Sequence, residues 1–313
     1  MLSANKMTQH TDSLDNAIAK TGRDFPGGVK SLAKKLSVNP GTLYNKFNPG
    51  MPSHRLTLQE ALDTMRHSQD VRILEVLCRK THHACVSQIQ FRNTGDMALF
   101  DAWTASDIEH GRTAEVIRSA LSDEQIDKDE FRGIRSEMFI DFARGLELLD
   151  RLNIFSSNPL RKKPPATTDL KQAIFETVQQ YPDGLPHLAR KLDMRETDLR
   201  KKADPDLPNE FPSIHDALKL MQVTENFSLL DTTAHQLNHT CIAIPRYDGD
   251  NDMALLDAWS SWSDERSDTI SAIHQALNDG EIDQDEIAGV EVNMFRDFET
   301  ELALLARLRS MIP

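Results

Sequence analysis

Two stretches of the sequence carry basic and hydrogen-bonding side chains at spacings that suit contact with nucleic acid. The first, SLAKKLSVNPGTLYNKFNP, spans residues 31–49, and the second, HLARKLDMRETDLRKKADP, begins at His187. Lysine and arginine bind phosphates, whereas hydroxyl and amide side chains bind base edges. In the first stretch and at the lysine directly before it we therefore predict DNA contacts from Lys30, Lys34, Lys35, Asn39, Gly41, Thr42, Tyr44, Asn45 and Lys46. In the second stretch the equivalent candidates are Arg195, Thr197, Arg200, Lys201 and Lys202.

A helix-turn-helix would present these side chains. Its two short helices pack at a fixed angle through apolar positions and one small residue. With Ala33 as the small residue, the positions expected to be buried are Leu32, Leu36, Val38 and Leu43. Asn39 is expected to cap the second helix and Pro40 to begin it, because asparagine and proline are favoured at these positions. That helix should end before Pro49.

Both stretches depart from the usual pattern. Ser37 and Asp193 stand at the turn position that glycine usually holds. Lys46 stands at a late apolar position, where the neighbouring Phe47 could substitute for it in the core. The second stretch also contains acidic residues at positions 196 and 198. The second copy therefore either reads DNA differently or has lost the ability, and an ordinary amphipathic helix pair is the alternative for each stretch.

The chain is an internal repeat. A shift of about 156 positions aligns residues 11–152 with 167–308, and roughly a third of the aligned pairs are identical. DMALFDAW at Asp96, for example, matches DMALLDAW at Asp252. Residues 156–168 are rich in Pro, Ser and Thr and are predicted to be a linker. The predicted modules are 1–155, with a helix-turn-helix at about 28–48 and an association region at about 96–152, and 169–313, with the corresponding regions at about 184–204 and about 252–309.

Apolar periodicity predicts an all-α fold. Val29, Leu32, Ala33 and Leu36 follow the i, i+3, i+4, i+7 spacing of one helix face, and the later TAEVIRSAL segment shows the same period. Only CVSQIQFR and CIAIPRY are weak strand candidates. Each module is thus expected to be a helical DNA-binding bundle followed by an acidic helical association region.

Composition indicates a globular protein, with 39% hydrophobic and 27% charged residues among 313. The net charge of −13 alone disfavours nucleic acid. The charge is uneven, however: residues 1–92 carry about +6 and residues 161–313 about −12. Three cysteines, no apolar leader and no run of eighteen apolar residues lead us to expect a cytoplasmic protein without membrane association.

The ordered blocks GGVKSLAKKLSVNPGTLYNKFNP, HRLTLQEALDTM, QDVRILEVL and DMALFDAW resemble the phage regulatory protein CII family of lysogeny regulators from P2-like phages and prophages. The resemblance covers nearly all of residues 14–152 and, more weakly, 170–308. It implies a helix-turn-helix DNA-binding region, helical self-association, and transcriptional control at phage promoters. The chain departs from the family by duplicating a normally single module, which puts operator symmetry in doubt because the two modules are not identical.

Three other motifs could bind metal or fill the core. LNDGEIDQDEI at Leu277 resembles the later half of a calcium loop, but Gln275 and Leu277 supply no early carboxylates, so a capped helix turn is the better account. His83 with Cys85, and His239 with Cys241, make a zinc or thiol site conceivable, although buried structural roles are commoner. We expect Trp103 and Trp259 in a helical core.

The leading hypothesis is a non-catalytic, sequence-specific transcription regulator that binds operator DNA and associates through its helical regions. RNA polymerase is a further partner under consideration, and we expect no cofactor and no metal. The alternative is that the second module is an acidic assembly or partner-binding half that does not bind DNA. An enzyme is disfavoured because the sequence has no nucleophile and base pair, phosphate loop or carboxylate pair.

Overall fold

The computed structural model describes residues 13–89, 96–123, 125–155, 169–245, 253–279 and 282–312. The predicted linker 156–168 lies outside them. The first copy contains α1 (Leu14–Asp24), α2 (Gly28–Lys35), α3 (Pro40–Lys46), α4 (Leu58–Ser68), α5 (Arg72–Lys80), β1 (His83–Ser87), α6 (Asp96–Ala120), η1 (Leu121–Asp123) and α7 (Lys128–Phe155). The second contains α8 (Leu170–Gln179), α9 (Gly184–Leu192), α10 (Glu196–Ala203), α11 (Ile214–Thr224), α12 (Ser228–His235), β2 (His239–Ala243), α13 (Met253–Ala276) and α14 (Gln284–Ser310).

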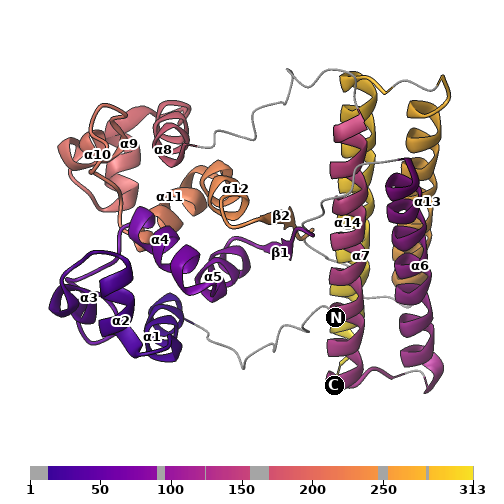
Figure 1. Cartoon of the computed structure of the whole chain (residues 1–313), viewed down its shortest axis with the longest axis horizontal. Helices are drawn as coiled ribbons and strands as arrows, with labels where there is room; N and C mark the ends of the chain where they lie inside the picture. Colours follow the sequence, from indigo (N-terminus) through magenta and orange to yellow (C-terminus); the bar gives the residue numbers. More distant parts are fainter. Residues whose placement is uncertain are drawn as a thin grey trace. The chain divides into compact units, whose positions relative to one another are not determined.

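The compact units of the fold do not follow the sequence repeat. Unit 1 combines residues 1–85 with 164–241, and unit 2 combines residues 86–163 with 242–313. Each unit therefore takes one half from each copy. Figure 1 shows the short helices α1–α5 and α8–α12 in unit 1 and the four long helices α6, α7, α13 and α14 in unit 2.

The two copies share one hydrophobic core in unit 1. It runs from Leu14 to Cys78 in the first copy and from Leu170 to Ala234 in the second. Helix α4 packs against α11, and α5 against α12. Because burial of apolar surface is the main stabilising contribution to folding, neither half can expose this shared core without a large loss of stability.

Reciprocal hydrogen bonds indicate an internal two-fold relation between the copies in unit 1. Thr57 and Ser213 form an antiparallel bridge, in which the Leu58 N–H donates to Pro212 and the Ile214 N–H donates to Leu56, both at 2.9 Å. A shift of about 156 positions converts either bond into the other. Such reciprocity is the signature of an isologous interface, here formed within one chain.

Side chains repeat the same relation at the edge of this interface. Arg66 donates to the Gln236 side chain at 2.7 Å, and Gln222 donates to the Lys80 carbonyl at 3.0 Å. These two bonds again join equivalent positions of the two copies. The backbone is preserved as well, because left-handed residues occur in the equivalent pairs Ser37 and Asp193, Gln69 and Glu225, and His82 and Asn238.

In unit 2, each copy contributes a hairpin of two long helices, and α7 of one hairpin packs against α14 of the other. The Phe142 and Phe298 rings meet with centroids 4.8 Å apart. At Gly145 the helices approach so closely that an added Cβ would lie 2.7 Å from Phe298 Cζ. The association regions predicted from the sequence are thus packed on each other within the chain.

Two details differ from the sequence predictions. The prediction of a mostly helical fold is confirmed, and His83–Ser87 and His239–Ala243 add one short two-stranded sheet at the weak strand candidates. Trp103 and Trp259 are only half-buried, whereas Trp262 is 1% exposed and takes the central position. None of the described helices is long and apolar enough to cross a membrane.

The partly buried Asp150 in α7 should make the stability of the folded protein depend on pH. Burial raises the pKa of this carboxyl to about 6, with nearby Glu147 adding to the shift. A folded-state pKa above the ordinary value of 3.8 means that the folded protein holds the proton longer, so this carboxyl costs stability progressively as pH rises from about 4 to about 6. The second copy has Ala306 at the equivalent position.

We therefore expect Asp150→Ala to stabilise the protein at pH 7 by on the order of 1 kcal/mol. The gain should shrink as the pH falls to about 4.5, because the wild-type carboxyl is then protonated. Urea unfolding of variant and wild type, followed by circular dichroism at pH 7 and at about pH 4.5, measures the gain in stability. A difference between variant and wild type that grows on acidification would contradict the account.

Candidate nucleic-acid interface

The angle between α2 and α3 is set by a tight turn and by buried apolar side chains where the two helices meet. Leu32 and Ala33 are fully buried and Leu43 is 3% exposed. Ser37 adopts a left-handed backbone with φ of 57°, and the Val38 N–H donates to the Ala33 carbonyl at 3.0 Å. The turn position therefore needs the glycine-like conformation that the sequence pattern implies, although serine occupies it.

Two of the expected apolar positions are less buried than predicted. Val38 is 37% exposed, which corrects its assignment to the core, and Leu36 is only partly buried. The left-handed turn at Ser37 directs the following residue outward before α3 begins. Phe47, in contrast, is 5% exposed and fills the late core position, as expected from its place beside Lys46.

Helix α3 begins and ends where the sequence predicts. The Asn39 side-chain oxygen accepts hydrogen bonds from the Gly41 N–H at 2.8 Å and the Thr42 N–H at 3.2 Å. Pro40 occupies the first turn, and the helix ends at Lys46. The cap uses the Asn39 side-chain oxygen, so this residue positions the helix and has only its amide nitrogen left for a DNA contact.

The predicted contact residues of the first copy divide into exposed and engaged side chains. The exposed ones are Lys30, Lys34, Lys35, Gly41, Thr42 and Tyr44, the last at 54% exposure. Asn45 is half-buried. Lys46 is also half-buried, and its Nζ lies 2.7 Å and 2.6 Å from the two carboxylate oxygens of Glu60. Since this ion pair neutralises the ammonium, Lys46 is a poor phosphate ligand in the described conformation.

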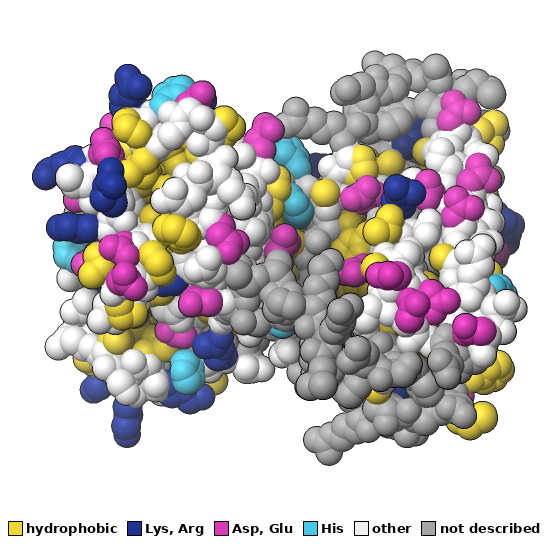
Figure 2. Space-filling view, turned by 90° about the horizontal axis from the view of Figure 1, so that it is seen from above, with side chains coloured by type: hydrophobic (Ala, Val, Ile, Leu, Met, Phe, Trp, Pro, Cys, Tyr) yellow, Lys and Arg dark blue, Asp and Glu magenta, His cyan; other side chains and the backbone are white. Residues whose placement is uncertain are grey.

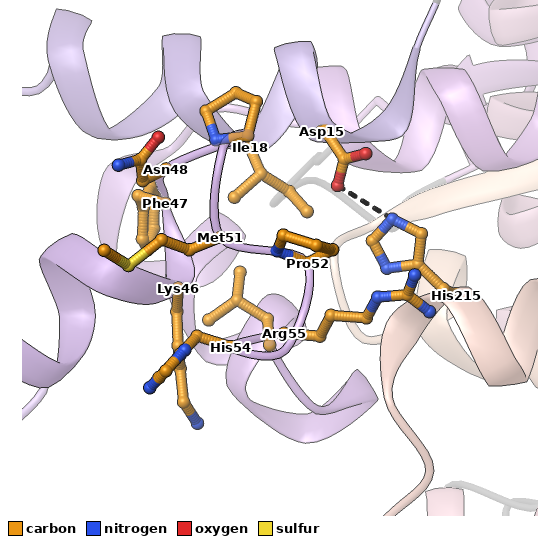
Figure 3. A pocket seen from close by; sticks show the side chains of 12 residues that line it. Asp15, Ile18, Lys46, Phe47, Asn48, Met51, Pro52, His54, Arg55 and His215 are labelled. Carbon is orange, nitrogen blue, oxygen red and sulfur yellow. Dashed lines mark ion pairs between the residues drawn. The ribbon is translucent and has the colours of Figure 1, made fainter.

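The segment after α3 adds two basic side chains that the sequence prediction missed. His54 and Arg55 are exposed, and they line a small pocket with Lys46, Met51 and Pro52. Figure 3 shows this loop beside Asp15, whose Oδ1 lies 2.8 Å from Nε2 of His215 in the other copy. The absence of acidic residues from 25 to 59 in the sequence was the signal that extends the basic surface to this segment.

The second copy presents a similar helix pair with a different charge pattern. Asp193 takes the left-handed turn with φ of 58°, and Leu199 of α10 is buried. Arg195, Thr197, Arg200 and Lys201 are exposed. Arg200 is held by Glu196 at 2.7 Å, and the half-buried Lys202 donates to the Phe211 carbonyl at 3.1 Å. The exposed cations of α10 are thus partly compensated by acids on the same helix.

The two helix pairs belong to the same unit and share one side of it. Figure 1 shows α3 and α10 at the left edge of unit 1. Figure 2 shows Lys and Arg side chains gathered at that edge. Unit 1 thus places α3 and α10 on the same side.

The histidine and cysteine pairs lie near the β1–β2 sheet. His83 Nδ1 lies 2.7 Å from the Thr81 carbonyl, and its ring contacts Phe227 with centroids 4.5 Å apart. Burial lowers the pKa of His83 and of His239. Cys241 Sγ lies 3.4 Å from Sγ of Cys78, which sequence reasoning did not consider. These contacts are those of packed core groups.

The acidic loop before α14 supports the capped-turn interpretation. Asp283 accepts hydrogen bonds from the Asp285 and Glu286 N–H groups at 2.8 Å, and Glu286 accepts from the Asp283 N–H. This reciprocal arrangement is a capping box. The carboxylates therefore cap a helix, while residues 280 and 281 of the motif lie outside the described part of the chain.

Comparison with known proteins gives one family. The family model described as phage regulatory protein CII (CP76) matches residues 12–153 and again residues 168–311. The search of curated proteins and the search of solved structures found no match. The two matched segments correspond to the two copies of the repeat.

Proposed function

The chain belongs to the phage regulatory protein CII (CP76) family, and we propose on this premise that it is a sequence-specific DNA-binding transcription regulator. In this proposal α2–α3 is a helix-turn-helix whose second helix enters the major groove. The observation that carries it is the exposed face of α3, with Thr42 and Tyr44, beside the exposed Lys30, Lys34 and Lys35. Hydroxyl groups can contact base edges there while the lysines bind flanking phosphates.

The internal two-fold relation supports binding of one chain to two half-sites on the DNA. Dimeric regulators place two recognition helices on half-sites separated by one helical turn or a multiple of it. Here one chain supplies both α3 and α10, so no encounter between subunits is needed. The residues of the two helices differ, with Tyr44 in α3 at the position of Arg200 in α10. The preferred operator is therefore two unlike half-sites rather than a palindrome.

Substitution on α3 tests the proposal. DNA selected from a random pool by the wild-type chain serves as the probe, and binding is measured by fluorescence anisotropy. We expect the double variant Thr42→Ala, Tyr44→Ala to bind at least about 10-fold more weakly with unchanged helicity, because base contacts contribute about 1–3 kcal/mol each. Lys34→Ala should reduce the steepness of the plot of log binding constant against log salt concentration by about 1, because one phosphate contact is lost.

Lys80→Ala is the matched control. It removes the same charge at the exposed end of α5, directly before β1. Its affinity and salt slope should equal those of the wild type. If the α3 double variant retains full affinity, this face of the protein does not bind DNA.

A second candidate function concerns α10 alone. The Glu196–Arg200 ion pair and the half-buried Lys202 favour a second copy that assembles or binds a partner without reading bases. One such partner is RNA polymerase. The double variant Arg200→Ala, Lys201→Ala discriminates: a large loss of affinity for the selected DNA supports two reading helices, and unchanged affinity supports the assembly role.

A further inference from the structure

The interior of unit 2 contains a cluster of charged side chains that the DNA-binding proposal does not use. Asp141 on α7 is 3% exposed, and Asp297 and Glu301 on α14 are each 1% exposed. His110 on α6 reaches this cluster, with Nδ1 3.2 Å from Asp141 Oδ2. Asp297 and Glu301 are four residues apart and so share one helix face. Four ionisable groups from three helices thus converge inside the bundle.

Two carboxylate oxygens in the cluster lack partners. Among the described residues, Glu301 Oε1 and Asp297 Oδ1 are buried without a hydrogen bond of normal geometry, and the Trp262 side chain lies near the Glu301 carboxyl. Buried polar atoms are paired in the great majority of cases because desolvation without a partner is costly. The buried carboxylates of this cluster therefore lack enough cationic or hydrogen-bonding partners.

Arg266 supplies only part of that charge. Its guanidinium lies 3.6 Å from Asp297 Oδ2 and also 3.6 Å from Asp107 Oδ1. The Arg266 charge also acts on Glu301, so one cation serves three carboxylates, while His110 contacts Asp141. A divalent cation would balance the remaining carboxylate charge.

We propose that His110, Asp141 and Glu301 form a binding site for a divalent transition-metal ion. One potential ligand atom from each residue lies within 4.8 Å of those from the other two. Ligand atoms at about 2.0–2.2 Å from a common ion lie at most about 4.4 Å apart, so the three side chains must rotate inward slightly to bind one ion. One imidazole with two carboxylates is a donor set that suits zinc, iron or manganese better than calcium.

The two copies contribute differently to this site, which explains why it forms once. His110 corresponds to Arg266 in the repeat, and Glu301 corresponds to Gly145. The imidazole from one copy and the carboxylate from the other are thus both departures from the repeat, and they converge at one point. A bound ion would join α6 and α7 of the first copy to α14 of the second.

The experiment uses the full-length chain, stripped of metal with a chelator and titrated with Zn²⁺ in a calorimeter. We expect one ion per chain. Glu301→Gln and His110→Ala should each weaken binding by roughly 10-fold or more. Glu115→Gln makes the same chemical change on the exposed surface of α6, and should bind as the wild type does. No stoichiometric binding by the stripped wild type, or equal binding by both site variants, overturns the proposal.

Co²⁺ substitution in the wild-type chain gives a readout that does not depend on the folding of a variant. Binding at His110, Asp141 and Glu301 should give visible absorption bands without a thiolate-to-cobalt charge-transfer band, because no sulfur is among the ligands. A charge-transfer band would place the ion on the cysteines instead and overturn the proposal. At the same concentration, Zn²⁺ should also raise the thermal transition of the wild type more than that of Glu301→Gln.

Discussion

Phe47→Ala is expected to lower the free energy of unfolding by about 3–5 kcal/mol, the usual cost of removing a buried phenylalanine ring. The ring is 5% exposed and packs against Gly22 of α1. A Cβ at Gly22 would lie 2.5 Å from Phe47 Cδ1 and 2.9 Å from Val29 Cγ2. Gly22→Val alone should therefore also destabilise the protein, through overpacking.

In the second copy the larger and the smaller of the two packed residues are exchanged. Val178 stands at the position of Gly22, and Ala203 at that of Phe47, and both are buried. The double variant Gly22→Val, Phe47→Ala transfers this arrangement to the first copy. It should be more stable than the sum of the two single effects predicts, by about 1 kcal/mol or more.

A double-mutant cycle from urea unfolding measures the coupling between the two positions. Val29→Ala combined with Phe47→Ala provides a comparison in which two buried apolar groups are removed without any replacement volume. Strict additivity of Gly22→Val and Phe47→Ala would show that the two residues do not share one packing site.

Local features of the α2–α3 helix pair could be predicted from the sequence because short-range patterns determine them. Asn39 and Pro40 define the start of α3 through a cap and a fixed φ, and Phe47 was recognised as the substitute for Lys46 in the core. The exposure of Val38 could not be predicted, since it depends on the left-handed turn at Ser37. The ion pair of Lys46 with Glu60 joins residues 14 positions apart and depends on α2, which contacts both α3 and α4.

The arrangement of the repeat could be only half predicted. Sequence identity shows that residues 11–152 have a second copy, but it does not show that each compact unit takes one half from each copy. The contacts that decide this, such as Leu58 with Pro212, join distant segments. The His110, Asp141 and Glu301 cluster was missed for the same reason, because its members lie on three helices and form no sequence motif.

The shared core makes a strong prediction for the chain divided at its repeat boundary. Residues 1–155 and 169–313, produced as two separate polypeptides in one cell, should assemble into a 1:1 complex. The reason is that the interface elements lie on both sides of the division: α4 with α11, α5 with α12, and α7 with α14. Size-exclusion chromatography with light scattering should give the mass of the undivided chain less residues 156–168, and urea unfolding should become dependent on protein concentration.

Each polypeptide alone should behave differently from the mixture. Residues 1–155 alone would expose apolar side chains that the second copy covers, including Leu56 and Leu58 at the bridge and Phe142 in the bundle. Exposure of such surface favours self-association or loss of structure over a stable monomer. If both pieces instead elute as monomers, unfold cooperatively and do not bind each other, the two copies are independent modules and the shared core is wrong. Point variants in the undivided chain are therefore the better test of DNA binding, because truncation at this boundary would remove half of each unit.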